Sequence, residues 1–465
     1  MNARRQLLAR FGGRRPAPPI DPPVAGALIV SKTGDNANAG TLASPWRTIT
    51  HAIAQANPGD TIYLRGGYYD VVGTDAYLWG FPGSSLVFSG TEANPINVSS
   101  YPGEWAIFDG RNSTVHPRYL NDGKRPGGDA FLIRFIGEYV NWSDLEFRNS
   151  DGYGFSVTSR YCTYRNIVHQ RNNQHGFHSQ SRHCVFEDNI SVDNYGLESG
   201  GNAGNGYANI NGSLISNEWP GEVSGDCEWR RNIAVANSDD GITAANTKNN
   251  LFEYNVMMLN GRGPNGDGNG FKMGLASTTE TNNVFRFNIA YNNRANGFDT
   301  NTSQGVLVHN CIAFRDAAAA TGFVLTRFSE DESDNDAFNN IVVGFQNRRA
   351  VGTLTTHTHN VGSPGSWDGT GNLGAFTESE LALLSTDPTN ANFAKLGEAS
   401  LARGAGTTGA GFSTDLGAIP YGTEFADGWD WQAKVAQYPS AGEGLTTTEF
   451  VDGADREVMV LLPQT

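Results

Sequence analysis

The sequence is poor in cysteine, in charged residues and in long apolar runs. Four of its 465 residues are cysteine and no two have Cys-x-x-Cys spacing, which argues against a disulfide-stapled small domain and a cysteine zinc site. Charged residues make up 17% of the chain, too few for a protein built from long amphipathic helices. No apolar run reaches membrane-spanning length, so we expect no membrane partner.

The net charge and the position of the basic residues limit the kinds of molecule that this chain is expected to bind. The formal net charge of −15 disfavours general binding to nucleic acid, and an acidic substrate would require basic residues gathered in one groove. Five arginines fall within the first nineteen residues without the apolar segment of a secretory signal, so we expect no conventional signal peptide. We interpret residues 1–26 as a basic, proline-rich arm that is too poor in apolar residues to fold without a partner.

Glycine and asparagine are abundant, and both recur in a repeat. The chain holds 57 glycines, and an asparagine followed closely by Ile or Val returns at steps of 23, 43, 23, 33, 22 and 30 residues. A second phrase, glycine followed by an apolar residue, interleaves with the first. The first phrase occurs at Asn166, Asn189, Asn232, Asn255, Asn288, Asn310 and Asn340, and the second at Gly154, Gly176, Gly206, Gly241, Gly270, Gly297 and Gly322.

The step length and the residue types predict a solenoid. A step near 22 residues fits one three-strand coil of a parallel β-helix; longer steps fit coils with loops, and the step of 43 fits one such coil or two coils. Stacked turns should then align the asparagines in an amide ladder. Cys162, Cys184 and Cys227 precede their repeat asparagine by four or five residues, so we expect one column of buried thiols. The predicted fold class is all-β, a right-handed parallel β-helix.

Both ends of such a stack need a cover. Ser44 and Pro45 have the pattern of an N-cap and a first-turn proline, which predicts a short N-terminal capping helix. Thr377 and Glu380 have the pattern of a capping box, which predicts a short helix through Leu384 in a C-terminal cap. The predicted divisions are a basic arm, a β-helix domain and an aromatic tail or cap: residues 1–26, 27–422 and 423–465.

Several stretches resemble β-helix lyases. Ser44–Tyr69 is similar to the opening of many secreted β-helix lyases, a pattern shared widely among β-helices. Three later stretches, in this order along the chain, resemble the pectate lyases of polysaccharide lyase family nine: Asn237–Gly241, Gly266–Gly274 and Gly297–Asn301.

The resemblance implies calcium-dependent β-elimination on an acidic, uronic-acid-containing polysaccharide. Carried over by position, Lys272 is the Brønsted base, and Asp239 and Asp240 are calcium ligands. Asn205 is the third candidate ligand. Asn205 and Thr243 stand where the resemblance implies further aspartates, which weakens the expected calcium site because affinity follows ligand charge.

The remaining site candidates concern the substrate. Arg262 and Arg327 are candidates for binding substrate carboxylates through their bidentate guanidinium groups. Asp267 joins the site if its loop folds back over the acidic pair. The resemblance also implies an extracellular setting.

Each of these residues has a plainer interpretation. Asp239 and Asp240 precede a glycine and fit a tight turn. Lys272 follows an inward phenylalanine, so it fits a solvated lysine on the outer face of a strand. His175 and His178, three residues apart, should point to opposite faces of a strand, which argues against a metal pair.

Two other functions stay open. The first is a glycoside hydrolase that uses two carboxylates among Asp239, Asp240 and Asp267. The second is a virion-associated tail spike or fibre that binds or depolymerises surface polysaccharide, with or without catalytic activity. In that setting we expect a homotrimer attached to other virion proteins through residues 1–26.

Overall fold

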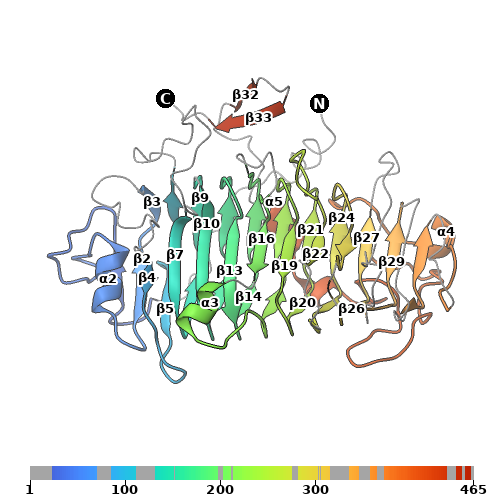
Figure 1. Ribbon diagram of the computed structural model, residues 1–465, viewed down its shortest axis with the longest axis horizontal. Coiled ribbons are helices and arrows are strands. Elements are labelled where there is room, and N and C mark those ends of the chain that lie inside the picture. The colour runs from blue at the N-terminus through green and yellow to red at the C-terminus, as the bar shows by residue number, and fades with distance from the viewer. Residues whose placement is uncertain are drawn as a thin grey trace.

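The computed structural model describes most of the chain, and every structural statement below concerns the described residues. These are residues 23–70, 85–110, 131–150, 152–196, 203–210, 213–274, 281–301, 303, 305–314, 335–344, 357–363, 371–436, 447–452 and 456–461. Their strands form three long parallel sheets, which run side by side along one axis (Figure 1), and one antiparallel pair. Neighbouring strands in each long sheet come from successive coils. The all-β parallel β-helix predicted from the repeat is confirmed.

Successive coils contribute strands to the three long sheets, and the described residues give twelve, eight and eleven of them. The first sheet contains β1 Leu28–Val30, β2 Thr61–Leu64, β5 Ile96–Ser100, β8 Val140–Ser143, β11 Thr163–Arg165, β14 Val185–Glu187, β17 Glu228–Arg230, β20 Leu251–Glu253, β23 Val284–Arg286, β26 Leu307–His309, β28 Asp336–Phe338 and β30 His357–Thr358. The second contains β4 Leu86–Val87, β7 Phe131–Glu138, β10 Tyr153–Arg160, β13 Phe177–Arg182, β16 Tyr207–Ile210, β19 Ile242–Ala245, β22 Phe271–Met273 and β25 Phe298–Asp299. The third contains β3 Gly67–Asp70, β6 Ala106–Asp109, β9 Leu145–Arg148, β12 Val168–Gln170, β15 Ile190–Val192, β18 Ile233–Val235, β21 Val256–Met258, β24 Ile289–Tyr291, β27 Ile312–Phe314, β29 Ile341–Val343 and β31 Val361–Ser363. The antiparallel pair is β32 Thr447–Asp452 and β33 Arg456–Leu461.

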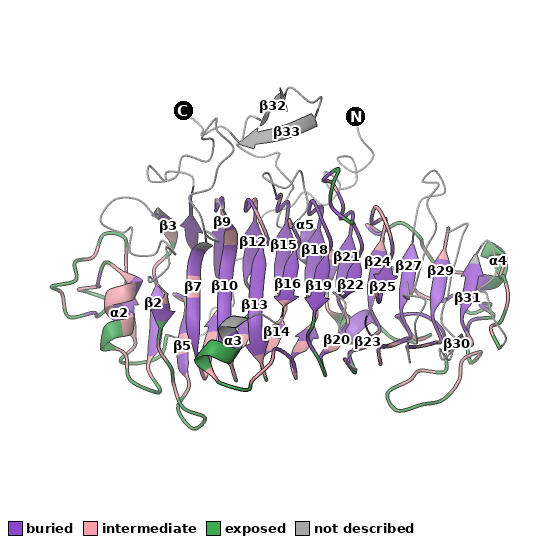
Figure 2. Cartoon of the chain, in the orientation of Figure 1, coloured by how far each residue is buried: buried purple, intermediate pink, exposed green. Residues whose placement is uncertain are grey.

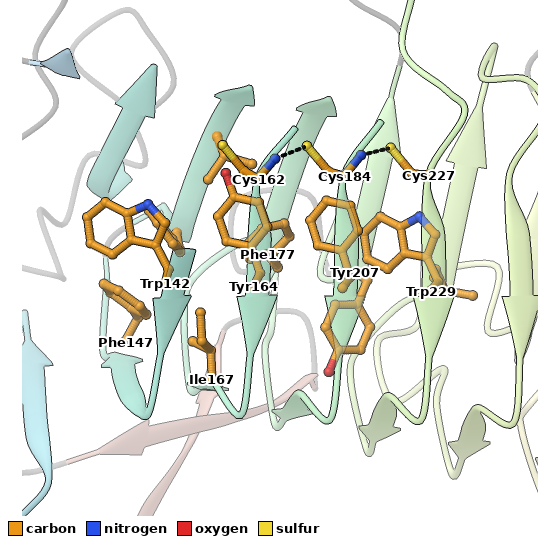
Figure 3. Packing of buried hydrophobic residues seen from close by; sticks show 14 of the residues in the cluster. Trp142, Phe147, Cys162, Tyr164, Ile167, Phe177, Cys184, Tyr207, Cys227 and Trp229 are labelled. Carbon is orange, nitrogen blue, oxygen red and sulfur yellow. Dashed lines mark hydrogen bonds between the residues drawn. The ribbon is translucent and has the colours of Figure 1, made fainter. Parts of the chain in front are cut away.

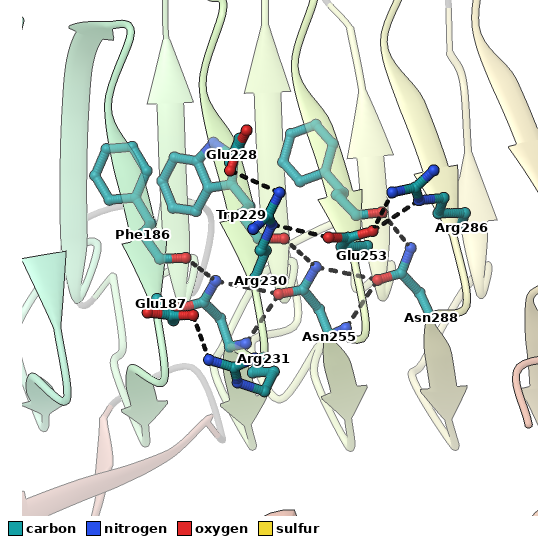
Figure 4. Close-up of polar contacts among 12 residues, drawn as sticks. Phe186, Glu187, Glu228, Trp229, Arg230, Arg231, Glu253, Asn255, Arg286 and Asn288 are labelled. Atoms are coloured by element: carbon teal, nitrogen blue, oxygen red, sulfur yellow. Dashed lines mark hydrogen bonds and ion pairs between the residues drawn. The ribbon is translucent and has the colours of Figure 1, made fainter. Parts of the chain in front are cut away.

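Buried asparagines form a ladder in the turn between the first and third sheets. The side-chain nitrogen of Asn189 donates to Oδ1 of Asn232, that of Asn232 to Asn255, and that of Asn255 to Asn288, at 3.0–3.1 Å. Figure 4 shows the last of these bonds, flanked by Arg–Glu ion pairs on the outer surface. The predicted amide ladder is present because each coil places its turn directly over the one before.

Two of the repeat asparagines fall outside this ladder. Ile167, and not Asn166, stands opposite Asn189 and donates its backbone N–H to Oδ1 of that residue at 2.9 Å. Cys311, and not Asn310, occupies the corresponding place beside Asn340. Asn166 and Asn310 adopt φ of 51° and 50°, the left-handed conformation that asparagine tolerates best among non-glycine residues.

The predicted cysteine column is also present. The backbone N–H of Cys162 donates to Sγ of Cys184, and that of Cys184 to Sγ of Cys227, both at 3.4 Å (Figure 3). Cys162, Cys184 and Cys227 are free and buried, as expected, and so is Cys311. Large aromatic side chains stack beside the column, and Phe186 and Trp229 lie 3.8 Å apart between ring centroids.

A short helix lies against the first coil, as predicted, but its start differs. Helix α2 spans Ile49–Gln55 and contacts β1 and β2, with Ile49 and Ala52 buried. Its N-cap is Thr48, whose hydroxyl accepts a hydrogen bond from the backbone N–H of His51, so the predicted cap at Ser44 is wrong. Ser44 instead exchanges backbone hydrogen bonds with Thr41, both at 3.1 Å, and so lies in a turn before the helix.

The segment after the last coil returns along the outside of the third sheet. Helix α4 (Glu378–Leu381) begins with the predicted capping box of Thr377 and Glu380. It ends at Leu381 and not at the predicted Leu384, because Ala382 adopts a left-handed conformation. The 3₁₀ helix η3 (Phe425–Gly428) and helix α5 (Trp431–Ala436) follow. This segment buries one outward aliphatic column, which consists of Val168, Ile190, Ile233, Val256, Ile289, Ile312, Ile341 and Val361.

One coil carries a helical insertion. Strand β14 pairs directly with β17, so the step of 43 residues between Asn189 and Asn232 is a single coil and not two. Helix α3 (Ser213–Glu218) lies within this coil and contacts β10 and β13 of the second sheet. Figure 2 shows that the strands of the sheets are buried, whereas this helix is largely exposed where it is described.

The described helices are all short, and none of them has the length and apolar character needed to span a membrane. The division at residues 26 and 422 stays a prediction, and residues 1–22 lie outside the described part of the chain.

Candidate active site

Lys272 lies on the outer face of the second sheet. Strand β22 places Phe271 and Met273 in the core, each 1% exposed, so strand alternation turns Lys272 outward. Its neighbours in register are Thr243 of β19 and Asp299 of β25. Because neighbouring parallel strands lie about 4.8 Å apart, these three residues occupy one short stretch of the outer face.

A column of polar residues lies in the turn that precedes the second sheet. The backbone N–H of each residue donates to the side chain one coil earlier: Asn205 to Nδ1 of His175 at 3.2 Å, and Asp240 to Oδ1 of Asn205 at 2.9 Å. The same pattern continues from Asn269 to Oδ1 of Asp240 at 2.7 Å and from Asn296 to Oδ1 of Asn269 at 3.1 Å. Asp240 therefore occupies a ladder position that asparagine fills in the coils on either side.

Asp239 holds the loop of residues 261–268 in place. Its Oδ1 accepts a hydrogen bond from the backbone N–H of Asp267 at 2.6 Å. The loop closes where Gly261 and Gly268 meet, and a Cβ on Gly261 would lie 2.6 Å from Cα of Gly268, so glycine is needed there. The loop folds back over the acidic pair, which is the condition under which Asp267 joins the site.

The site holds Lys272 in its charged form. Its Nζ pairs with the carboxylate of Asp267 and lies 3.7 Å from Oδ2 of Asp240. Burial alone would lower the pKa of Lys272, but the negative charges of Asp240 and Asp267 outweigh it and raise the pKa. Burial, and next the charge of Asp239, raise the pKa of Asp240, whereas the charge of Lys272 opposes that shift and favours the carboxylate. Lys272 is thus the counter-charge of the acidic cluster.

The oxygens of the expected calcium ligands face hydrogen-bond donors of the chain itself. Calcium takes about six to eight oxygen ligands at about 2.3–2.6 Å. Oδ1 of Asn205 faces the backbone N–H of Asp240, and Oδ1 of Asp240 faces Asn269. Among the described residues, no three acidic, histidine or cysteine side chains form a group that could hold a metal ion. The arrangement therefore does not fit calcium, and we derive no catalytic step through it.

The two predicted arginines do not add to the described site. Arg262 pairs through Nη1 with the carboxylate of Asp193 and donates to the carbonyl of Ala236 at 3.2 Å, contacts that join its coil to the two coils before it. Arg327 lies outside the described residues. The structure brings the other predicted site residues together: Lys272, Asp239, Asp240, Asn205 and Asp267.

Sequence analysis missed two features of this face. Asn269 donates to Asp240 from both its backbone and its side chain, and its place two residues before Phe271 was the available signal. His175 and His178 do not point to opposite faces, because their rings lie 6.0 Å apart with planes 9° from parallel. His175 belongs to the turn before β13, where strand alternation does not apply.

Comparison with known proteins gives consistent results. Residues 28–335 match the family model described as Pel9A-like, right handed beta helix region. The pectate lyase PEL9 of Emericella nidulans is 27% identical over 366 residues, which cover 71% of this chain and 78% of the relative. Pectate lyase L of Dickeya chrysanthemi is 24% identical over 295 residues, which cover 59% and 62%. The crystal structure of pectate lyase Pel9A aligns with a TM-score of 0.63 at 21% identity, covering 85% of this chain and 97% of that one.

Proposed function

This chain belongs to the Pel9A-like right-handed β-helix family, and from that premise we propose how it acts as a polysaccharide lyase of the pectate-lyase type. It cleaves a uronic-acid-containing polymer by β-elimination, with Lys272 as the base. One observation carries the assignment of the base. Lys272 is outward on β22, and its ammonium group contacts the acidic cluster of Asp240 and Asp267.

The reaction assigns a proton transfer to the lysine. In β-elimination the base removes the proton on C5 of the uronate, the electron pair forms a C4–C5 double bond, and the C4–O bond breaks as the leaving oxygen takes a proton. Lys272 must be neutral to accept the C5 proton, yet Asp267 and Asp240 hold it as an ammonium. Asp267 is the partner that can leave, because its side chain is 60% exposed whereas that of Asp240 is 1% exposed.

The substrate is defined by class. We propose an acidic polysaccharide as the partner of the outer face of the second sheet, in an extracellular setting, in keeping with the pectate lyases among the relatives. The identity of the sugar, the predicted trimer and the predicted attachment through residues 1–26 stay predictions. The described residues and the comparisons favour neither the virion spike nor the glycoside hydrolase, so neither is proposed further.

The test is ultraviolet detection of the unsaturated uronide product. Polygalacturonate, alginate and other uronic polymers are incubated with the native protein, with Lys272→Ala and with Lys248→Ala, an exposed lysine of the same β-helix as a matched control. Native protein and control should form unsaturated product at equal rates. Lys272→Ala should lose about 100-fold or more of the rate, the usual contribution of a positioned base. Reducing ends without unsaturated product would instead show hydrolysis, and retained elimination in Lys272→Ala would remove the lysine from the base role.

A further inference from the structure

Protein donors already satisfy the oxygens of the acidic pair. Asp239 accepts from the backbone N–H of Asp267 at Oδ1 and from that of Ala203 at Oδ2, at 2.6 and 3.1 Å. Asp240 accepts at Oδ1 from the backbone and side chain of Asn269, at 2.7 and 3.0 Å. Its Oδ2 accepts from the hydroxyl of Thr243 at 3.0 Å. Each of the four carboxylate oxygens thus has a donor within the chain.

These donors belong to different parts of the fold, so each oxygen is fixed by a different segment of the chain. Ala203 lies one coil before the pair, Asn269 one coil after it, and Asp267 in the loop above it. A cation drawing these oxygens together would have to break ladder bonds between coils, and it would meet the ammonium of Lys272, which lies 3.7 Å from Asp240. Both carboxyls are nearly buried, so any lost donor leaves a costly unsatisfied group.

We propose that in this chain the acidic pair of Asp239 and Asp240 has a structural role, with Lys272 as its counter-charge. Neither the stability of the site nor its lyase activity then depends on calcium. Asp239 and Asp240 hold the loop of residues 261–268 over Lys272, and Asn269 locks the next coil to them. The activity part of this inference rests on the proposed function, whereas the stability part does not.

The side chains at positions 205 and 243 distinguish this site from a calcium site. Asn205 uses its amide oxygen to accept the backbone N–H of Asp240, and Thr243 uses its hydroxyl to donate to the carboxylate of Asp240. Neither side chain carries a charge. Aspartate at both positions would put two more carboxylates against Asp240, which would repel one another unless a divalent cation joined them.

The experiment measures thermal unfolding of the full chain with millimolar calcium or with a chelator. The native protein should show the same midpoint in both, within about 1 °C, because a ligand that does not bind the folded state adds no stability. The double variant N205D/T243D should unfold several degrees lower in chelator and recover that loss in calcium. Lys248→Ala serves as the control for substitution on the same β-helix.

Two results would overturn the inference. One is a chelator-reversible rise of several degrees in the native protein; the other is a folded double variant that is indifferent to calcium. If the double variant does not fold, calorimetric titration of the native protein with calcium decides alone, because saturable binding would refute the inference and absence of heat would support it. Product formation by the native protein with and without chelator is scored separately, so a failed lyase assignment leaves the unfolding result intact.

Discussion

Replacing Asn255 tests how much the turn ladder contributes to stability. Asn255 is fully buried, and its side chain takes part in four hydrogen bonds. Its Oδ1 accepts from the backbone N–H and side chain of Asn232, and its Nδ2 donates to Oδ1 of Asn288 and to the carbonyl of Trp229. Asn255→Ala removes all four. At about 1 kcal/mol for each bond, the free energy of unfolding should fall by roughly 4 kcal/mol.

The ladder itself supplies a milder substitution for comparison. Cys311 occupies the same column between Asn288 and Asn340, where Sγ takes the place of the amide. Asn255→Cys should therefore cost clearly less than Asn255→Ala, because the thiol fills space and keeps weak polar contacts.

The assay is guanidinium unfolding followed by tryptophan fluorescence, with Lys248→Ala as the exposed control. A loss below about 1 kcal/mol in Asn255→Ala would show that water or a local shift replaces the ladder bonds, and would refute the reasoning. Equal losses for the alanine and cysteine variants would show that volume, and not hydrogen bonding, sets the cost.

Two further predictions concern buried titratable groups. His169 stacks on Phe147, neither ring nitrogen has a partner among the described residues, and burial lowers its pKa to about 3. As the pH falls, the unfolded chain therefore binds the proton before the folded one does. Relative to His169→Phe, the native protein should lose up to about 5 kcal/mol of stability between pH 6.5 and pH 3. Unfolding measured at several pH values tests this. Lys434 of α5 is buried against Asn166, and burial lowers its pKa to about 8. Between pH 8 and 10.5 the unfolded lysine holds the proton that the folded one has lost. The stability of the native protein relative to Lys434→Met should therefore rise by up to about 3 kcal/mol across that window. A stability difference that does not change with pH would contradict the burial.

The repeat made the fold predictable, and its errors have local causes. Stacked coils carry the same residue type in the same place, so the cysteine column and most of the asparagine ladder could be inferred from spacing. Asn166 and Asn310 were placed in the ladder because a spacing argument cannot resolve a shift of one residue within a turn. In the structure, Ile167 and Cys311 occupy the ladder column one residue later in each turn. Their backbone N–H groups donate to the side chains of Asn189 and Asn340.

The site was predictable in its members and not in its contacts. Lys272, Asp239 and Asp240 followed from a motif, and the structure brings them together. Whether the carboxylates point to a metal or to protein donors depends on the loop of residues 261–268 and on Asn269 one coil away. Such directions arise from register between coils, which no single stretch of sequence contains.

The chemistry of this face arises where a column changes its residue type. In the turn column, asparagine precedes and follows Asp240, so the aspartate keeps every backbone bond of the ladder and adds a negative charge. On the outer face, Thr243 gives way to Lys272 in the next coil, which places a positive charge beside that aspartate. The fold tolerates both exchanges because stacking depends on backbone register and inward side chains, and neither residue faces the core. A β-helix can therefore acquire a charged site by substitutions in two adjacent columns, and the residues beside them, Asn205 and Thr243, then determine whether that site needs a metal ion.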